Sequence, residues 1–253
     1  MAASIFSHME YQGMTMQTKL IDYKTQDFVM EGFIAIGESA KPLQPLILIV
    51  HDWSGHNEFV EDKARYFAKQ GFVAFAVDLY GKGQRGSATD KGINQKLMGK
   101  LMHDRAVIVT RLQAAIDCAL ANAPVDPDKI MALGFCMGGL AVLDFARSGV
   151  NINGVISVHG LLHPPQQSNN AIKAKVLVLQ GQQDPMVDSQ QLQAFEEEMT
   201  QAQVDWQLHM FGNTYHAFTN PNANDPAMGL LYSATANSRT WALVRSFTDE
   251  LLG

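Results

Sequence analysis

Gly134-Phe-Cys-Met-Gly-Gly139 is the stretch that decides the fold of this 253-residue chain. A short apolar run, residues 129–133, precedes it, and an apolar run with helical spacing follows at once. A turn this tight between a strand and a helix strains its central residue and needs small neighbours two positions to either side. Glycine at positions 134 and 138 meets that need. The stretch therefore predicts a sharp strand-to-helix turn with Cys136 at its apex.

Working outward, apolar runs and helical patterns alternate along the chain. Short, nearly continuous apolar runs are typical of strands buried on both faces of a parallel sheet; they lie at residues 45–50, 72–77, 129–133, 154–158 and 175–179, with a further strand expected at 205–211. Helical spacing is found at residues 59–70, 95–121, 138–148, 189–202 and 225–252. Two alternating segments, 18–23 and 28–36, predict an antiparallel N-terminal hairpin. We expect an α/β fold with a doubly wound, mostly parallel sheet and helices on both faces.

Composition limits the remaining choices. Hydrophobic residues make up 47% of the chain and charged residues 17%, which favours one domain over residues 18–253. Residues 1–17 are expected to be a disordered or expression-derived extension.

The net charge of −6, with no basic stripe, argues against a nucleic-acid partner. Two cysteines, no signal-peptide pattern and no apolar run of membrane-spanning length predict a cytoplasmic protein with no membrane contact. The choice between monomer and homodimer stays open.

The chemistry centres on Cys136. A cysteine at a helix N-terminus faces the positive end of the helix dipole, which favours the nucleophilic thiolate. The alternative is that Cys136 is a small buried hydrophobe in a turn that only closes a loop. Cys118 lies within an apolar helical pattern, and we expect its role to be structural.

A cysteine nucleophile needs a histidine base, and the histidine needs an acid that orients it. Asp184 follows the strand expected at 175–179, although an Asp before Pro185 also suits an ordinary turn. His216 lies in the loop after the strand expected at 205–211. Three suitable residue types, each beyond a strand end, occur in the order nucleophile, acid, base that α/β-hydrolases use. We therefore predict a Cys136-Asp184-His216 triad.

Acyl transfer also needs two backbone N–H groups aimed at the developing oxyanion. The residue after the nucleophile, Met137, is expected to supply one. The other is expected from the loop after residue 50, with Trp53 preferred and Asp52 as the alternative. His51-Asp52 and His56 could suggest a metal site. Two histidines in one loop without a convincing third ligand are a weak pattern, so we expect no metal site.

Residues 18–252 resemble the dienelactone hydrolase (carboxymethylenebutenolidase) family of the α/β-hydrolase superfamily. The resemblance rests on four marks: the cysteine turn at 134–139, Val77-Asp-Leu-Tyr80, Gly181-Gln-Gln-Asp184 and His216-Ala-Phe218. It implies hydrolysis of a small lactone or ester substrate through an acyl thioester, with no cofactor. It also implies that an acid in the early loop holds the resting thiol. Asp52 matches that position with a shorter side chain than the family's Glu, and its alternative role is to cap backbone N–H groups.

The substrate class is less sharply defined. The resemblance implies two arginines that bind a substrate carboxylate, but this chain has Lys82 and Arg85 in the first region and Thr219 in the second. Lys82 and Arg85 are expected either to bind substrate or to be solvated loop charges. A general carboxylesterase or thioesterase is therefore the second hypothesis, and a non-catalytic ligand-binding domain is the third. Residues that follow strand ends are expected either to line the substrate pocket or to pack; they are Trp53, His56, Tyr80, His159 and Phe218.

Overall fold

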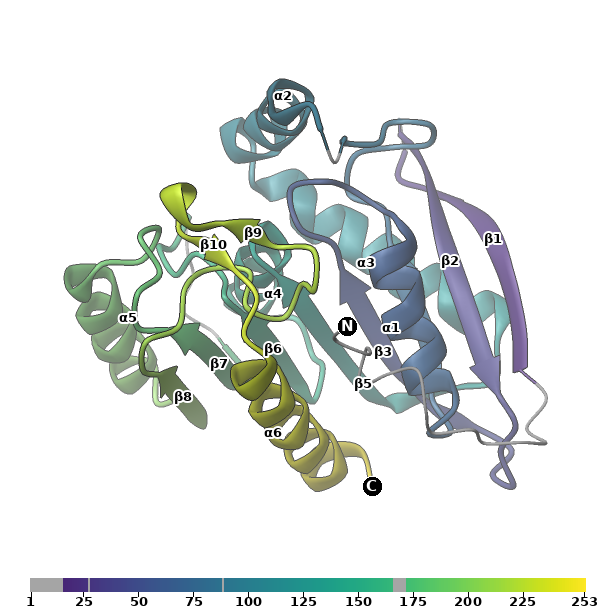
Figure 1. Cartoon of the computed structure of the whole chain (residues 1–253). Helices are drawn as coiled ribbons and strands as arrows, with labels where there is room; N and C mark the ends of the chain where they lie inside the picture. The colour runs from purple at the N-terminus through teal and green to yellow at the C-terminus, as the bar shows by residue number, and fades with distance from the viewer. Residues whose placement is uncertain (1–15, 27, 88, 166–171) are drawn as a thin grey trace.

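A computed structural model describes residues 16–26, 28–87, 89–165 and 172–253. Residues 1–15 of the expected N-terminal extension lie outside the described residues. One eight-stranded sheet runs through the described chain in the order β1-β2-β4-β3-β5-β6-β7-β8 (Figure 1). The strands are β1 Met16–Lys24, β2 Val29–Gly37, β3 Gln44–Val50, β4 Val73–Val77, β5 Val125–Phe135, β6 Gly154–Val158, β7 Lys175–Gly181 and β8 Trp206–Phe211.

The sheet is mostly parallel, as predicted. Among the described strands of this sheet, β2 alone runs opposite to the others: it pairs antiparallel with β4 and with β1, and the β1–β2 pair is the expected antiparallel hairpin. Met16 pairs with Gly37, so the hairpin begins two residues before residue 18, where the domain was expected to start. The α/β class and the doubly wound sheet are confirmed.

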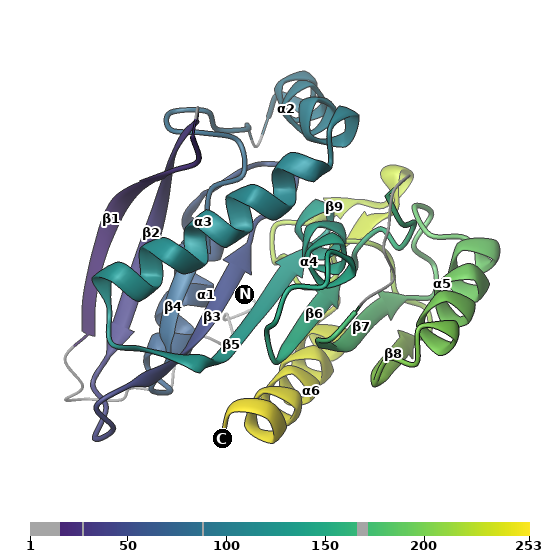
Figure 2. The same cartoon turned by 180° about the vertical axis from the view of Figure 1, so that it is seen from behind.

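Helices cover both faces of this sheet (Figures 1 and 2). α1 (Glu58–Ala68) and α6 (Ala234–Leu252) lie on one face, and α3 (Ala106–Asn122), α4 (Met137–Arg147) and α5 (Ser189–Gln201) lie on the other. Val60, Ala64 and Phe67 recur at helical spacing and are buried under α1, which explains why this segment forms a helix on the sheet. Two apolar cores result, one on each face.

Two predicted helices were wrong in their extent. The segment 95–121 forms two helices, α2 (Lys91–His103) and α3, because Asp104 has non-helical angles of φ −134° and ψ 83°. In the segment 225–252, the helix α6 begins only at Ala234, where the Ser233 side chain accepts a hydrogen bond from the Ala236 N–H. A small hairpin precedes it, with strands β9 (Asn224–Asp225) and β10 (Leu230–Leu231) around a 3-10 turn.

The six parallel strands β3 to β8 bring the loops that follow their carboxyl ends to one edge of the sheet. Val50 of β3 pairs with Gly134 of β5, and Gly181 of β7 pairs with Phe211 of β8. The loops that follow these carboxyl ends therefore meet in space, which is where open α/β sheets bind ligands. No helix in the described part of the chain is long and apolar enough to cross a membrane.

Candidate active site

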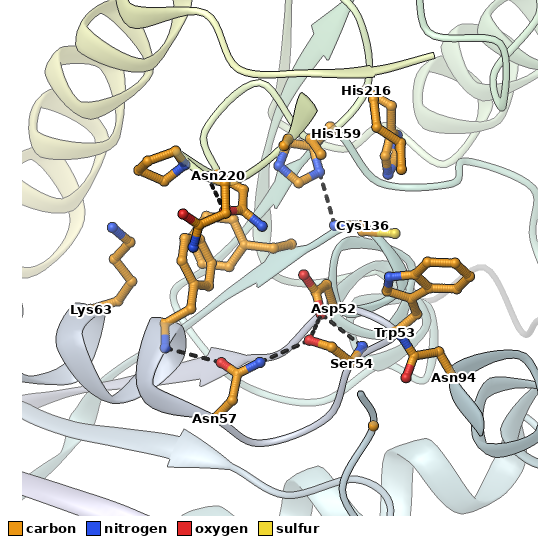
Figure 3. A pocket seen from close by; sticks show the side chains of 18 of the residues that line it. Asp52, Trp53, Ser54, Asn57, Lys63, Asn94, Cys136, His159, His216 and Asn220 are labelled. Carbon is orange, nitrogen blue, oxygen red and sulfur yellow. Dashed lines mark hydrogen bonds between the residues drawn. The ribbon is translucent and has the colours of Figure 1, made fainter. Parts of the chain in front are cut away.

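Cys136 sits at the apex of the turn between β5 and α4. Its backbone has φ 53° and ψ −114°, a strained conformation for a residue with a side chain. A Cβ atom at Gly134 would overlap the backbone of Gly138, and one at Gly138 would overlap the Val50 carbonyl. Only glycine permits these approaches, so the sequence folds into the predicted turn. The Cys136 side chain lines a pocket at the N-terminus of α4 (Figure 3).

Asp184 and His216 form a buried pair on neighbouring loops. The His216 Nδ1 lies 2.7 Å from Asp184 Oδ2 and donates a hydrogen bond to it. Asp184 Oδ2 also accepts from Gln180 Nε2 at 2.8 Å, and Oδ1 accepts from the Met186 N–H at 2.9 Å. These bonds orient the carboxylate. Because Nδ1 carries the proton toward Asp184, Nε2 is the nitrogen left to face the pocket.

His216 and Cys136 line the same pocket and lie next to each other in Figure 3. The buried His216 Nε2 has no hydrogen-bond partner among the described residues. Burial lowers the pKa of His216, but the neighbouring Cys136 side chain, the hydrogen bond with Asp184 and the Asp184 charge together raise it to about 10. The site therefore favours the protonated form of His216.

The two backbone N–H groups expected to form the oxyanion hole have no acceptors among the described residues. Neither the Met137 N–H nor the Trp53 N–H donates a hydrogen bond to any described residue. The His51 ring fixes the loop that carries Trp53. His51 Nδ1 donates to the Asp52 carbonyl at 2.6 Å, and His51 Nε2 accepts from the Leu79 N–H at 3.0 Å. Both nitrogens of His51 are thus engaged within the protein, and the described residues contain no group of three or more side chains arranged to hold a metal ion.

The pocket has a volume of about 1330 Å³, which exceeds what a small lactone needs, so size alone does not select the substrate. Of the side chains expected to line it, Trp53, Arg85 and His159 do so, as does His56. Tyr80, Lys82 and Phe218 are not among the described residues that line this pocket, and their expected part in substrate binding stays a prediction.

Each of these three side chains has a different contact. The Tyr80 hydroxyl donates to the Trp53 carbonyl at 2.9 Å, so it supports the Trp53 loop rather than the substrate. Lys82 Nζ pairs with Asp22 at the surface. Phe218 is fully buried, with its ring 5.1 Å from that of His159. The contacts of Tyr80 and Phe218 match the packing role, which was the alternative for residues after strand ends.

Asp52 lines the pocket, but its carboxylate caps its own loop. Asp52 Oδ1 accepts hydrogen bonds from the Ser54 N–H at 2.8 Å and from the Ser54 hydroxyl. Ser54 Oγ in turn accepts from Asn57, the N-cap residue of α1 (Figure 3). No hydrogen bond joins Asp52 to Cys136. The geometry matches the alternative role, in which the carboxylate caps backbone N–H groups.

Arg85 and Thr219, at the two positions where the family's arginines bind a substrate carboxylate, both contact other residues of this chain. Arg85 lies 3.1 Å from Glu31 and 3.4 Å from the buried Asp78. Thr219 is 1% exposed, and its hydroxyl lies 2.9 Å from His159 Nε2. Arg85 and Thr219 therefore do not form a pair of free cations that could bind a substrate carboxylate.

The sequence analysis did not identify Gln180, which donates a hydrogen bond to the Asp184 carboxylate. It lies within β7 and is fully buried. The available signal was a polar side chain at the end of an otherwise apolar strand, because a buried amide needs a polar partner close by.

Comparisons with known proteins show which family the chain resembles. A family model described as the dienelactone hydrolase family matches residues 30–252. A putative carboxymethylenebutenolidase of Aquifex aeolicus is 25% identical, covering 92% of this chain and 99% of the relative. The carboxymethylenebutenolidase of Pseudomonas putida is 26% identical over 79% of this chain and 84% of its own. A solved dienelactone hydrolase-like promiscuous phosphotriesterase from metagenomic libraries is 32% identical, with a TM-score of 0.88, covering 94% of this chain and 99% of the other.

Proposed function

The chain belongs to the dienelactone hydrolase family of hydrolases, and from that premise we propose that Cys136, Asp184 and His216 form a catalytic triad acting on small lactones or carboxylic esters. One observation carries the proposal. His216 is fixed by Asp184 at 2.7 Å on one nitrogen, while its other nitrogen has no full hydrogen-bond partner among the described residues and faces the pocket that Cys136 lines. That is the arrangement a thiol nucleophile and its base require.

The first step is acylation of Cys136. The thiolate sulfur attacks the substrate carbonyl, and the Trp53 and Met137 N–H groups donate to the oxyanion that develops. When the intermediate collapses, the carbon–oxygen bond to the alkoxide breaks and the His216 imidazolium gives its Nε2 proton to that alkoxide. The products are an alcohol and an acyl thioester on Cys136; with a lactone, both stay joined in one molecule.

The second step regenerates the enzyme. His216, now neutral, accepts a proton from water while the water oxygen attacks the thioester carbonyl. The carbon–sulfur bond breaks, the carboxylic acid leaves, and the thiolate–imidazolium pair forms again. Asp184 stabilises the imidazolium in both steps through the hydrogen bond to Nδ1. No redox change and no cofactor are needed for the balance.

For the substrate, we propose an ester or lactone whose recognition does not depend on a carboxylate between two arginines. Arg85 is paired with Glu31 and Asp78, and Thr219 is bonded to His159. A general carboxylesterase or thioesterase specificity stays the alternative within the same chemistry. The proposed location is the cytoplasm, in line with the two unpaired cysteines.

Phosphotriester hydrolysis is a second candidate activity. It is favoured by the similarity to the metagenomic phosphotriesterase over nearly the whole of both chains. The same thiolate would attack phosphorus in place of carbon, displacing the leaving alkoxide or phenoxide. Water that gives a proton to His216 would then attack phosphorus, and the phosphorus–sulfur bond would break to release a phosphodiester and the thiolate.

A substrate panel on three proteins tests the proposal. We expect the wild type to cleave some of dienelactone, neutral lactones, aryl esters, thioesters and aryl phosphotriesters, and Cys136→Ala to lose at least about 10³-fold in kcat/KM on every one. Cys118→Ala is the matched control, because Cys118 lies on α3 outside the pocket, where burial raises the pKa of its thiol. Unchanged hydrolysis by Cys136→Ala would overturn the proposal. A folded wild type inactive on the whole panel would favour the non-catalytic hypothesis.

A further inference from the structure

The residue after β6, His159, is bound on both ring nitrogens. The Cys136 backbone N–H donates a bifurcated hydrogen bond, to the Val158 carbonyl at 3.0 Å and to His159 Nδ1 at 3.1 Å (Figure 3). An N–H can only donate, so Nδ1 carries no proton and Nε2 carries it. Nε2 therefore donates to the Thr219 hydroxyl, 2.9 Å away. His159 thus joins the apex of the β5–α4 turn to the loop that carries His216.

The main chain is bent to put His159 there. Its φ is 42°, in the left-handed region, and its N–H is held by the Leu179 carbonyl at 2.8 Å. A Cβ atom at the next residue, Gly160, would overlap Ser157 Oγ and press on Gly139 of α4. Cys136 and Ala217, which follow β5 and His216, also have positive φ. Strain of this kind persists only where the surrounding structure requires it, and it gathers at functional sites.

The electrostatics keep His159 neutral. Burial, followed by the charge of His216, holds the pKa of His159 well below its usual range. Its ring centroid lies 4.9 Å from that of His216, so a proton on His159 would place a second cation beside the imidazolium. A proton on Nδ1 would also break the hydrogen bond from the Cys136 N–H. Neutral His159 therefore keeps the hydrogen bond from the Cys136 N–H and avoids repulsion of the His216 imidazolium.

We propose that His159 is a positioning residue that sets the backbone of Cys136 and the loop of His216 relative to each other through a two-way hydrogen-bond bridge. It does not serve as the substrate-binding residue expected from the sequence, because both of its ring nitrogens are engaged within the protein. The inference rests on the proposed roles of Cys136 and His216. It adds the Thr219 hydroxyl as the far anchor of the bridge.

Three variants separate the two ends of the bridge. His159→Phe keeps a ring and removes both hydrogen bonds, His159→Asn keeps an acceptor near the Nδ1 position, and Thr219→Val removes only the far anchor. We expect His159→Phe to lower kcat by about 10- to 100-fold through misplacement of the reacting groups. KM should stay within about threefold, because no substrate contact is lost. His159→Asn should recover part of the loss.

Thr240→Val is the matched control for Thr219→Val. Thr240 is a fully buried threonine of α6 whose hydroxyl has no hydrogen-bond partner among the described residues. We expect Thr219→Val to lower kcat by about tenfold, within the range for such misplacement, and Thr240→Val to leave it unchanged. If His159→Phe does not fold, Thr219→Val and His159→Asn still decide the outcome.

The pH profile gives the readout that a merely structural role would not move. In His159→Phe, the alkaline limb of kcat/KM should shift to lower pH, because a misaligned thiolate stabilises the His216 proton less. Partial unfolding would lower the amplitude and leave the limb in place. A raised KM with unchanged kcat, or unchanged kinetics in both His159→Phe and Thr219→Val, would overturn the inference. Failure of the triad itself is distinguishable, because Cys136→Ala would then hydrolyse as the wild type does.

Discussion

The carboxylate of Asp184 accepts three hydrogen bonds, and this determines which nitrogen of His216 faces Cys136. Gln180 supplies one of these bonds from the strand behind the site. An acid held so firmly can orient the imidazole and stabilise its charge without itself taking the proton.

Asp184→Asn is expected to lower kcat/KM by about 10³- to 10⁴-fold, because an amide nitrogen turned toward His216 would favour the wrong tautomer. The fold should survive, since asparagine occupies the same space. Ester hydrolysis and thermal melting of the same preparation check both statements. A loss of less than tenfold in a well-folded variant would mean that Asp184 does not orient the base.

The pH dependence follows from the His216 proton. Since the pKa of His216 is raised to about 10, the imidazolium persists through neutral pH and is lost as the pH rises through that value. We expect kcat/KM for an alkyl ester to fall there, because its alkoxide must take this proton. An aryl ester, whose phenoxide leaves without a proton, should show little of this decline. An alkyl-ester profile that falls near pH 7 would contradict the ion pair.

The sequence was sufficient to propose Cys136, Asp184 and His216, because each follows a strand end in the order that the chemistry uses. It could not reveal the bridge from His159 to Thr219, which joins two loops sixty residues apart in the chain. A histidine after a strand end carries the same pattern whether it binds substrate or a backbone N–H. Only the paths of the two loops distinguish these roles.

At the scale of elements, the β5–α4 turn depends on contacts between backbones. Gly134 and Gly138 meet each other and the end of β3 with no room for a side chain. The position of Cys136 is therefore set by the packing of a strand against the first turn of a helix.

Gly134→Ala is expected to destabilise the fold by about 3 kcal/mol, because its methyl group would overlap the Gly138 backbone. Gly99→Ala is the matched control. Gly99 lies inside α2, where a Cβ atom would meet nothing within 4 Å, and alanine there should stabilise by about 0.5–1 kcal/mol. Urea unfolding of both variants measures the difference. Equal stabilities for the two variants would remove the packing argument for the turn.

Element types were predicted better than element ends. The break at Asp104 and the late start of α6 escaped prediction, because apolar spacing continues across both places. Local features determine these ends: Asp90 caps α2, and Ser233 caps α6. A capping residue looks like any other polar residue until its backbone geometry is known.

At the scale of the whole molecule, a buried ionic network joins α4 to α5. The Arg147 guanidinium is 1% exposed; it forms two hydrogen bonds to Glu198 of α5, at 2.8 and 2.7 Å, and one to the Leu162 carbonyl. Asp144 of α4 is paired with Arg105 as well. The helix that begins at Cys136 is thereby fixed to its neighbours at its far end.

Arg147→Met is expected to lower the free energy of unfolding by about 3 kcal/mol, because Glu198 loses its partner in a largely buried place. The double variant Arg147→Met/Glu198→Met should recover much of that loss. Lys82→Met is the control, because the Lys82–Asp22 pair is about half exposed and is expected to contribute less than about 1 kcal/mol. A double variant no more stable than Arg147→Met would contradict the assigned cause.

The fold as a whole could be predicted because alternating strands and helices leave few topologies for a parallel sheet. The substrate could not be predicted in the same way. It depends on which side chains remain open to the pocket once Arg85 and Thr219 have taken partners within the protein. The long-range contacts that engage them follow from the folded arrangement, not from any local pattern.

The central claim is that Cys136 carries the acyl group during hydrolysis, and mass spectrometry of acid-quenched enzyme tests it most directly. After brief reaction of the wild type with an aryl acetate, the account predicts one added acetyl group on the peptide that contains Cys136, and none in Cys136→Ala. His216→Ala, which lacks the base for deacylation, should retain any acetyl group it acquires for longer. Rapid turnover with no acetyl group on Cys136, or the same adduct on another residue in Cys136→Ala, would contradict the account.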